Sequence, residues 1–532
     1  MRLSLALCAS LLLAGPTLAA PVVTEAPLRA HLAFLADDLM EGRGTGQRGG
    51  ELAVRYLESQ AAIIGLKPAN GNSYRQSVKF VGSTTRATST IKFDVGGRTL
   101  APKLGSEIAI VNANGSPEVR FDAPLVFVGY GIEAPDEQWN DYAGVDVKGK
   151  VLVIMVNDPK PTAAEPNRFG GKSLTYYGRW VYKFDEARRR GAAGVLLIHT
   201  TESASYDWSV AALTFGRENF TLGNGNPVQG WIHENTARAL FTAAGKDLDA
   251  LRAQAEVRGF KPVDLGVHVR VALDSAQRTV EQFNVAGIIP GSDPALKDQA
   301  VIYSAHWDHH GKAEGSGDRI YNGAVDNASG AAALLAMAQA AVNKPARRTQ
   351  IFLWPCGEEQ GLLGATGYMR EPLWPLAKTA ADLNLDSMNF VGKTRDMGVA
   401  GAEHSTLLAS AGKVARAMGL KLAPSTPDLG GAYFRADHFI FARAGVPAFN
   451  VGSAVFSGDG SFDFEHDQVA SSAKMVAFKE RYHQVTDEYD PSWDLSGMVQ
   501  QAQFTLNLGY EVANTTAMPA WNKGDPLGQT KR

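Results

Sequence analysis

The sequence has few cysteines, and this scarcity limits how the fold can be stabilised. Only Cys8 and Cys356 occur among its 532 residues, and Cys8 lies in an apolar N-terminal segment. If that segment is removed, Cys356 stands alone and an intramolecular disulfide is excluded. The acidic pair Glu358 and Glu359 follows closely, and negative charges raise the pKa of a thiol. We therefore interpret Cys356 as a small apolar core residue and not as a nucleophile.

The chain also lacks a strong charge imbalance and long apolar runs. Its net charge is −3, so no basic surface indicates a nucleic-acid partner. Beyond the N-terminus no stretch reaches the roughly 18 uninterrupted apolar residues of a membrane span. With 45% hydrophobic and 20% charged residues, the composition is that of a globular protein. At roughly 150 residues per domain, the length predicts two to four domains.

The N-terminal segment reads MRLSLALCASLLLAGPTLAA. A positive charge at Arg2 precedes a short apolar run, and small residues follow. This pattern is typical of a secretory signal peptide, and it is too short for a membrane span. We predict cleavage after Ala19 or Ala20, and therefore a protein that is exported to a periplasm or to the extracellular space.

Periodicity divides the remaining chain into an outer part and an inserted part. Helical spacing of apolar residues covers 27–64, and alternation typical of strands covers 75–112. The stretch 118–275 has an α/β rhythm of its own and no cluster of metal-type ligands, which predicts an inserted domain. The predicted divisions are a signal peptide (1–20), a first part of the main domain (21–112), an inserted domain (113–278), the catalytic part of the main domain (279–516) and a loose tail (517–532).

From residue 283 onward, short apolar runs alternate with helical patterns. Examples are the strand-like AVIYSAH, the Ala-rich helix GAAALLAMAQAAV and the strand-like TQIFLWPC. Such βαβ succession predicts an α/β fold with a mostly parallel, mixed sheet flanked by helices. In such sheets, ligands bind beyond the carboxyl ends of the strands.

Residues able to bind a metal follow these predicted strands. They are His306 and Asp308, the pair Glu358–Glu359, Asp386, Asp326 just before the Ala-rich helix, and His483 in a distant polar loop. Each alone has an ordinary structural explanation, such as a helix N-terminal acid or a solvated face. Their joint occurrence at strand ends instead predicts a site for two divalent metal ions, because two His and three carboxylates supply enough donors when one carboxylate bridges.

The remaining residues near these positions can support the ligands. Asp308 lies two residues after His306 and can orient its imidazole through the second ring nitrogen. Neighbouring side chains leave the backbone in different directions. One member of the Glu pair can therefore bind metal while the other acts as a general base.

The motifs AHWDHHG, NGAVDNASG, GEEQGLLGATGY, NLDSM and YHQVTDEYD resemble those of the zinc aminopeptidases of family M28. The resemblance covers about 26–110 and 280–515. Within the inserted part, DYAGVDVKGKVLVIM and KFDEARRRGAAGVLLI resemble a protease-associated (PA) domain. The resemblance implies the zinc exopeptidase fold, with two zinc ions per chain and peptides as substrates.

The resemblance also implies a role for each site residue. One zinc would be bound by His306, Asp326 and Asp386, and the other by Asp326, Glu359 and His483. It makes Glu358 the general base and Asp308 the residue that orients His306. Tyr482 would donate to the oxyanion, and Arg435, Asp437 and His438 would shape the substrate pocket or support it. His309 is expected to hydrogen-bond locally, and His310 has no expected role.

The function expected from these residues is removal of N-terminal residues from peptides by metal-activated water, with Glu358 as the base. Three alternatives stay open at this point. The same scaffold carries carboxypeptidases and dipeptidases, and it carries glutaminyl cyclases with a single zinc. An inert protein that binds partners through the PA-like part belongs to a different class, and a complete ligand set argues against it.

Overall fold

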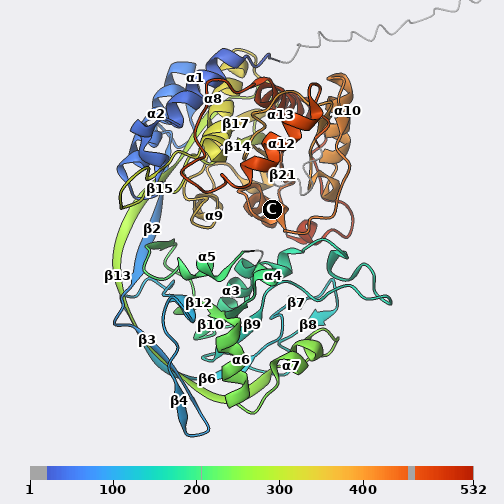
Figure 1. Ribbon diagram of the computed structural model, residues 1–532. Helices are drawn as coiled ribbons and strands as arrows, with labels where there is room; N and C mark the ends of the chain where they lie inside the picture. The colour runs from blue at the N-terminus through green and yellow to red at the C-terminus, as the bar shows by residue number, and fades with distance from the viewer. Residues whose placement is uncertain (1–20, 205, 453–461, 531–532) are drawn as a thin grey trace, which may run out of the picture.

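The computed structural model describes residues 21–204, 206–452 and 462–530, so the expected signal peptide lies outside the described residues. Two lobes lie one above the other in Figure 1, and a very long strand, β13 (Val263–Ile289), runs along one side of both. Within the described ranges, no helix is long and apolar enough to cross a membrane.

The main lobe, residues 21–85 and 275–530, contains the mixed sheet that the sequence predicts. Its strand order is β21 (Ala448–Asn450), β18 (Thr379–Asn384), β14 (Ala300–Ser304), β17 (Thr349–Trp354) and β13. The first four strands are parallel, and β13 pairs antiparallel with β17. Nearly every residue of the parallel strands is buried, so both faces of the sheet are covered.

Helices from both ends of the chain cover this sheet. They are α1 (Glu25–Leu35), α2 (Arg48–Ile64), α8 (Ser329–Ala341), α9 (Leu363–Arg370), α10 (Leu407–Ala417), α11 (His438–Arg443), α12 (Gln468–Phe478) and α13 (Ser496–Asn514). The helix α8 is apolar on all sides and almost wholly buried, as its Ala-rich sequence predicts. Cys356 lies buried in the same core, in line with its interpretation as an apolar residue.

The insert lobe, residues 86–274, has separate hydrophobic cores. Its strands are β3 (Thr90–Val95), β4 (Arg98–Leu100), β5 (Ile108–Val111), β6 (Glu118–Phe127), β9 (Val151–Met155), β10 (Gly194–His199) and β12 (Val228–His233). Its longer helices are α3 (Trp180–Arg189), α6 (Glu234–Ala243) and α7 (Leu248–Ala255).

The boundary of this lobe differs from the predicted residue 113. The strands β3 and β5 belong to its sheet, and Ile91 and Ile108 belong to its core. Alternating apolar residues predict a strand but do not say which sheet the strand joins, so residues 90–111 were assigned to the wrong lobe.

The strand β13 connects the two lobes without a break. Residues 263–274 pair with β6 in the insert lobe, and residues 275–285 pair with β2 (Arg75–Thr85). Residues 285–289 then pair with β17 in the main lobe. One continuous strand, paired in turn with β6, β2 and β17, therefore fixes how the insert lobe is attached.

The C-terminal tail is packed, although the sequence predicted it to be loose. Trp521 is partly buried, and its indole Nε1 donates to the carbonyl of Gly445 at 2.8 Å. Asp525 bonds the His404 ring at 2.7 Å, and a short helix follows at Pro526–Gln529. The polar composition of the tail predicts a loose segment, but the single aromatic side chain of Trp521 anchors it.

Candidate metal centre

The carboxyl ends of three parallel strands bring the predicted ligands to one edge of the sheet. His306 lies two residues after β14, Glu358 and Glu359 lie shortly after β17, and Asp386 lies two residues after β18. Because these strands are adjacent and parallel, their ends meet at the same edge.

Asp326 lies between the two histidines and faces both. It belongs to the buried segment Ala324–Ala328, which immediately precedes α8. Its Oδ1 lies 3.3 Å from Nε2 of His306, and its Oδ2 lies 3.2 Å from Nε2 of His483. One carboxylate therefore presents one oxygen to each imidazole, which is the arrangement of a bridging ligand.

Each imidazole also faces a second carboxylate. Nε2 of His306 lies 3.5 Å from Oδ1 of Asp386, and Nε2 of His483 lies 3.2 Å from Oε2 of Glu359. Glu358 is more distant, with its Oε2 4.0 Å from Nε2 of His306. The site thus has two donor sets that share Asp326, with Glu358 beside the first of them.

These donor sets fit a pair of zinc ions. Two donors at zinc bond lengths around a tetrahedral ion lie roughly 3.3–3.5 Å apart, close to the spacings of the imidazole and carboxylate atoms. Among the described residues, Nε2 of His306 and Nε2 of His483 have no hydrogen-bond partner. The side chains are 6% exposed or less for His306, Asp326, Glu359 and Asp386, so the acids form a dense buried negative charge that a cation would neutralise.

The buried setting changes the proton affinities of the same groups. Burial disfavours the protonated ring of His483, but the carboxylates of Glu359 and Asp326 outweigh it and raise its pKa to about 10. Burial raises the pKa of the Glu358 carboxyl well above its ordinary value, and the adjacent His306 imidazole opposes this shift. The acids and imidazoles are thus strongly coupled through their charges.

Asp308 supports the site differently from the sequence prediction. The His306 ring bonds through Nδ1 to the main-chain carbonyl of Asp308 at 3.1 Å, while the Asp308 carboxylate lies 3.9 Å from the same nitrogen. That carboxylate instead accepts the backbone N–H of Glu358 at 3.1 Å. Asp308 therefore positions His306 with its carbonyl and Glu358 with its side chain.

The other two histidines of the run both face Glu359. Nδ1 of His309 lies 2.5 Å from Oε1 of Glu359, and Nε2 of His310 lies 3.6 Å from Oε2. The sequence had given His309 a local hydrogen bond and His310 no role. Glu359 lies 50 residues after His309 along the chain. The only sequence signal for this contact is the density of histidines beside His306.

The buried Asp487, whose role no sequence pattern predicts, holds the segment that carries Asp326. Its carboxylate accepts the N–H of Val325 at 3.0 Å and the N–H of Asp326 at 3.1 Å. Its carbonyl accepts the N–H of Ala324 at 3.0 Å. Because Asp487 lies four residues after His483, one loop supplies a candidate ligand and fixes another.

Arg43 was also missed, and it holds the loops on the other side. This fully buried guanidinium donates to the carbonyls of Trp307 at 2.8 Å and Gly323 at 2.9 Å, and also to those of Leu35 and Asn322. It thereby connects the segments before Asp308 and Asp326. Nothing in the local sequence of Arg43 marks these partners, which are 264 and 280 residues away.

The four remaining predicted residues lie around this centre at different depths. The Tyr482 ring stacks on the His483 ring at 3.8 Å between centroids. Asp437 is buried, and its burial together with Asp308 and Asp386 raises its carboxyl pKa to about 8, against the influence of His306. Burial lowers the pKa of the enclosed His438 to about 3, which indicates a structural position. Arg435 is half-buried and bonds the carbonyl of Gly430.

Comparison with known proteins shows which proteins this chain is similar to. Residues 284–506 match the model of peptidase family M28. A probable leucine aminopeptidase from Arthroderma otae is 28% identical over 139 residues, which are 25% of this chain and 36% of the relative.

Alignments with solved structures extend over most of the chain. An aminopeptidase from Aneurinibacillus sp. strain AM-1 has a TM-score of 0.49 at 19% identity and covers 92% of this chain and 94% of its own. A zinc aminopeptidase from Bacillus subtilis has a TM-score of 0.43 at 18% identity and covers 94% of this chain and 96% of its own. The match to the model of peptidase family M28 covers residues 284–506, the part of the chain that holds every candidate metal ligand.

Proposed function

We propose that the chain is a metal-dependent aminopeptidase that removes N-terminal residues from peptides. One observation carries this proposal, namely that the two Asp326 oxygens face two different imidazoles, each accompanied by a further carboxylate. The M28 domain match supports a peptidase, and the name of the curated relative supports an aminopeptidase. The N-terminal sequence pattern supports action after export, and we retain the PA resemblance of the insert lobe as part of the proposal.

Two zinc ions fit the two donor sets. The first set is His306, Asp326 and Asp386, and the second is Asp326, Glu359 and His483. Zinc at such a site supplies a Lewis acid for a carbonyl oxygen and lowers the pKa of water. The chain itself contributes the fixed orientation of the donors, through the carbonyl of Asp308 and the carboxylate of Asp487.

Glu358 is the carboxylate best placed to move a proton. Its side chain is 11% exposed, whereas those of Asp326, Glu359 and Asp386 are 3–6% exposed. Of these four acids, Glu358 is the most accessible to a substrate water. Its backbone N–H is held by Asp308, so its orientation is fixed. We assign to Glu358 the uptake of the proton of the attacking water and its transfer to the leaving amine.

The Tyr482 hydroxyl is proposed as a donor to the oxyanion that forms at the scissile carbonyl. Its ring is fixed by the stack on His483. Burial, followed by the nearby carboxylates, raises its pKa well above the ordinary value, so the phenol keeps the proton that it must donate.

A panel of chromogenic aminoacyl substrates and blocked peptides tests this function. We expect hydrolysis of substrates with a free amino terminus, loss of activity on chelation, and recovery when zinc is added back. N-acetylated substrates should resist cleavage. Preferential cleavage of N-acetylated peptides with a free carboxyl terminus would instead establish a carboxypeptidase, and no hydrolysis by fully zinc-loaded protein would refute both.

A further inference from the structure

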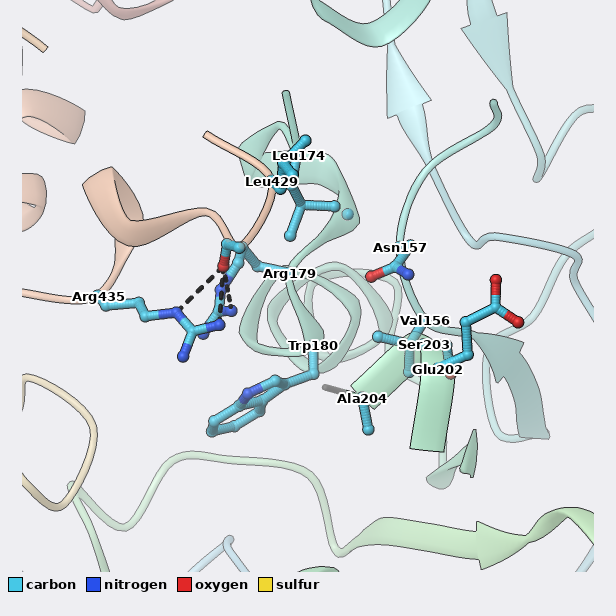
Figure 2. A pocket seen from close by; sticks show the side chains of 12 residues that line it. Val156, Asn157, Leu174, Arg179, Trp180, Glu202, Ser203, Ala204, Leu429 and Arg435 are labelled. Atoms are coloured by element: carbon cyan, nitrogen blue, oxygen red, sulfur yellow. Dashed lines mark hydrogen bonds between the residues drawn. The ribbon is translucent and has the colours of Figure 1, made fainter. Parts of the chain in front are cut away.

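A cavity of about 80 Å³ lies between the two lobes (Figure 2). From the insert lobe it is lined by residues around the start of α3 and by Glu202–Ala204, and from the main lobe by Leu429, Gly430 and Arg435. A water molecule needs only about 10–15 Å³ of such space. The cavity therefore has room for a small polar group such as a carboxylate with its solvent.

Two guanidinium groups meet at one side of this cavity, one from each lobe (Figure 2). Arg179 donates through Nη1 to the carbonyl of Gly430 at 3.4 Å, and Arg435 donates to the same oxygen through Nη2 at 2.7 Å and Nε at 3.1 Å. Within the described ranges, no carboxylate lies within ion-pair distance of either guanidinium. In addition, Nε of Arg179 is buried without a hydrogen-bond partner.

The surroundings neutralise this pair only in part, through the nearby Asp428. Burial lowers the pKa of Arg179 to about 10, and the charge of Arg435 acts in the same direction. Arg179 also precedes α3, whose first turn contains no acidic residue, so the positive end of that helix adds to the potential. The Asp428 carboxylate accepts the N–H groups of Ala432 and Tyr433. In Figure 2 the Glu202 carboxylate lies on the opposite side of the cavity.

Two packing contacts place the Arg179–Arg435 pair near the metal centre. Arg179 and Arg435 bond the same carbonyl, that of Gly430, and Tyr176 of the insert lobe packs against Phe439 of α11 at 4.8 Å between ring centroids. Arg435 lies just before α11, and α11 packs against β18, the strand whose carboxyl end is followed by Asp386. An extended peptide residue spans roughly 3.3–3.6 Å, so a chain of a few residues bridges such neighbouring sites.

We propose that Arg179 and Arg435 bind the terminal carboxylate of a short peptide whose amino-terminal bond lies at the metal centre. Arg is the side chain best suited to this task, because its planar fork donates two parallel hydrogen bonds to a carboxylate. The inference rests on the proposed aminopeptidase function and adds its substrate class, namely peptides of two to four residues with a free carboxyl terminus. The insert lobe thereby contributes directly to substrate selection.

The test compares each peptide with its own amide. Leu-Gly, Leu-Gly-Gly and Leu-Gly-Gly-Gly are assayed with the corresponding C-terminal amides, and the ratio of kcat/KM for acid over amide is taken at each length. We expect the zinc-loaded protein to favour the acid by about 10-fold or more at one or two lengths, as charge-assisted hydrogen bonds predict. The length with the largest ratio then reports the distance between the arginines and the metal centre.

Variants then assign this preference to the two arginines. R179Q and R435Q should each reduce the ratio toward one, and R435K should retain part of it because the charge remains. The matched control is R238Q, since Arg238 lies on the insert helix α6 and pairs with Glu234 and Asp249; it should leave the ratio unchanged. Because acid and amide are measured on the same sample, a partly misfolded variant does not alter the ratio.

The outcomes separate this inference from the proposed function. Hydrolysis of acids and amides at equal kcat/KM would overturn the carboxylate site and leave the aminopeptidase intact. No hydrolysis of any unblocked substrate would overturn the aminopeptidase itself. Comparing Leu-Glu-amide with Leu-Gln-amide shows whether a side-chain carboxylate is recognised instead. A preference for Leu-Glu-amide without any preference for free acids over amides would mean that the arginines bind an acidic side chain, and it would overturn binding of the terminal carboxylate.

Discussion

Both lobes contain parallel strands that end in polar residues, yet those residues have different surroundings. In the insert lobe β9 is followed by Asp158, whose carboxylate accepts the N–H and hydroxyl of Thr175. At the end of β10, His199 packs against Tyr206, Trp208 and Trp231. Among the described residues, neither Asp158 nor His199 belongs to a group of side chains that could hold a metal ion.

The strand ends of the main lobe converge on one another instead. Every group of metal-competent side chains in the described ranges lies there, on the ends of β14, β17 and β18 and on two loops. The comparison shows that position after a parallel strand is not enough to make a site. What distinguishes the main lobe is that its donors face one another: Nε2 of His306 and Nε2 of His483 each have two carboxylates within 3.5 Å.

The largest expected effect is the loss of the shared carboxylate. Asp326→Asn should remove at least one metal ion per chain and lower kcat/KM by more than about 100-fold, which is the upper range for residues that only support a ligand. Metal content by mass spectrometry and kinetics measure both effects. Asp158→Asn is the matched control from the insert lobe and should keep the metal content. Equal metal loss in both variants would show that the comparison of strand ends is wrong.

Glu358→Gln should separate chemistry from metal binding. The isosteric amide cannot accept a proton, so kcat should fall by about 10²- to 10⁴-fold while the metal content stays near two ions. Glu359→Gln is the companion variant, because the loss of a donor should lower the metal content as well. If Glu358→Gln kept a near wild-type kcat, the assignment of the base would fail.

His309→Gln tests the contact that the sequence analysis missed. Its ring bonds Glu359 at 2.5 Å, so its removal should weaken metal affinity or activity by about 10- to 100-fold. His310→Gln serves as the control from the same run, since its nitrogen is 3.6 Å from Glu359, and its effect should be smaller. Metal competition with a chelator measures the affinities. A larger loss of affinity in His310→Gln than in His309→Gln would contradict the assignment of His309 as the residue that supports Glu359.

Asp487→Asn should weaken the support of the Asp326 segment. The amide retains an oxygen but loses the charge that strengthens the hydrogen bonds to the N–H groups of Val325 and Asp326. We expect a loss of about 1–3 kcal/mol in the free energy of unfolding, measured by thermal or urea unfolding of the metal-free protein. Unchanged stability would show that the backbone holds this segment without the carboxylate.

The ligands at strand ends could be predicted from the sequence, whereas most of the residues that hold them in place could not. Each predicted ligand at a strand end follows a short buried run, so its position along the chain implies its position in space; this holds for His306, Glu359 and Asp386. Residues such as Arg43 and Arg179 act through contacts with backbone carbonyls of distant segments, and no periodicity marks such partners. For the same reason the alternation over residues 90–111 predicted strands but placed them in the wrong lobe.

The smallest expected effect concerns the packed tail, which has no metal-site role. Its bond between Asp525 and His404 raises the pKa of that imidazole above its ordinary value. A raised pKa in the folded state stabilises the docked tail below the unfolded value of about 6.5, and this stabilisation is lost as the pH rises through the folded value. Limited proteolysis should therefore cleave the tail faster at pH 8 than at pH 6. Asp525→Asn should remove most of this pH dependence while the kcat/KM of the metal centre stays unchanged, whereas a pH-independent cleavage rate in the unaltered protein would show that Trp521 alone docks the tail.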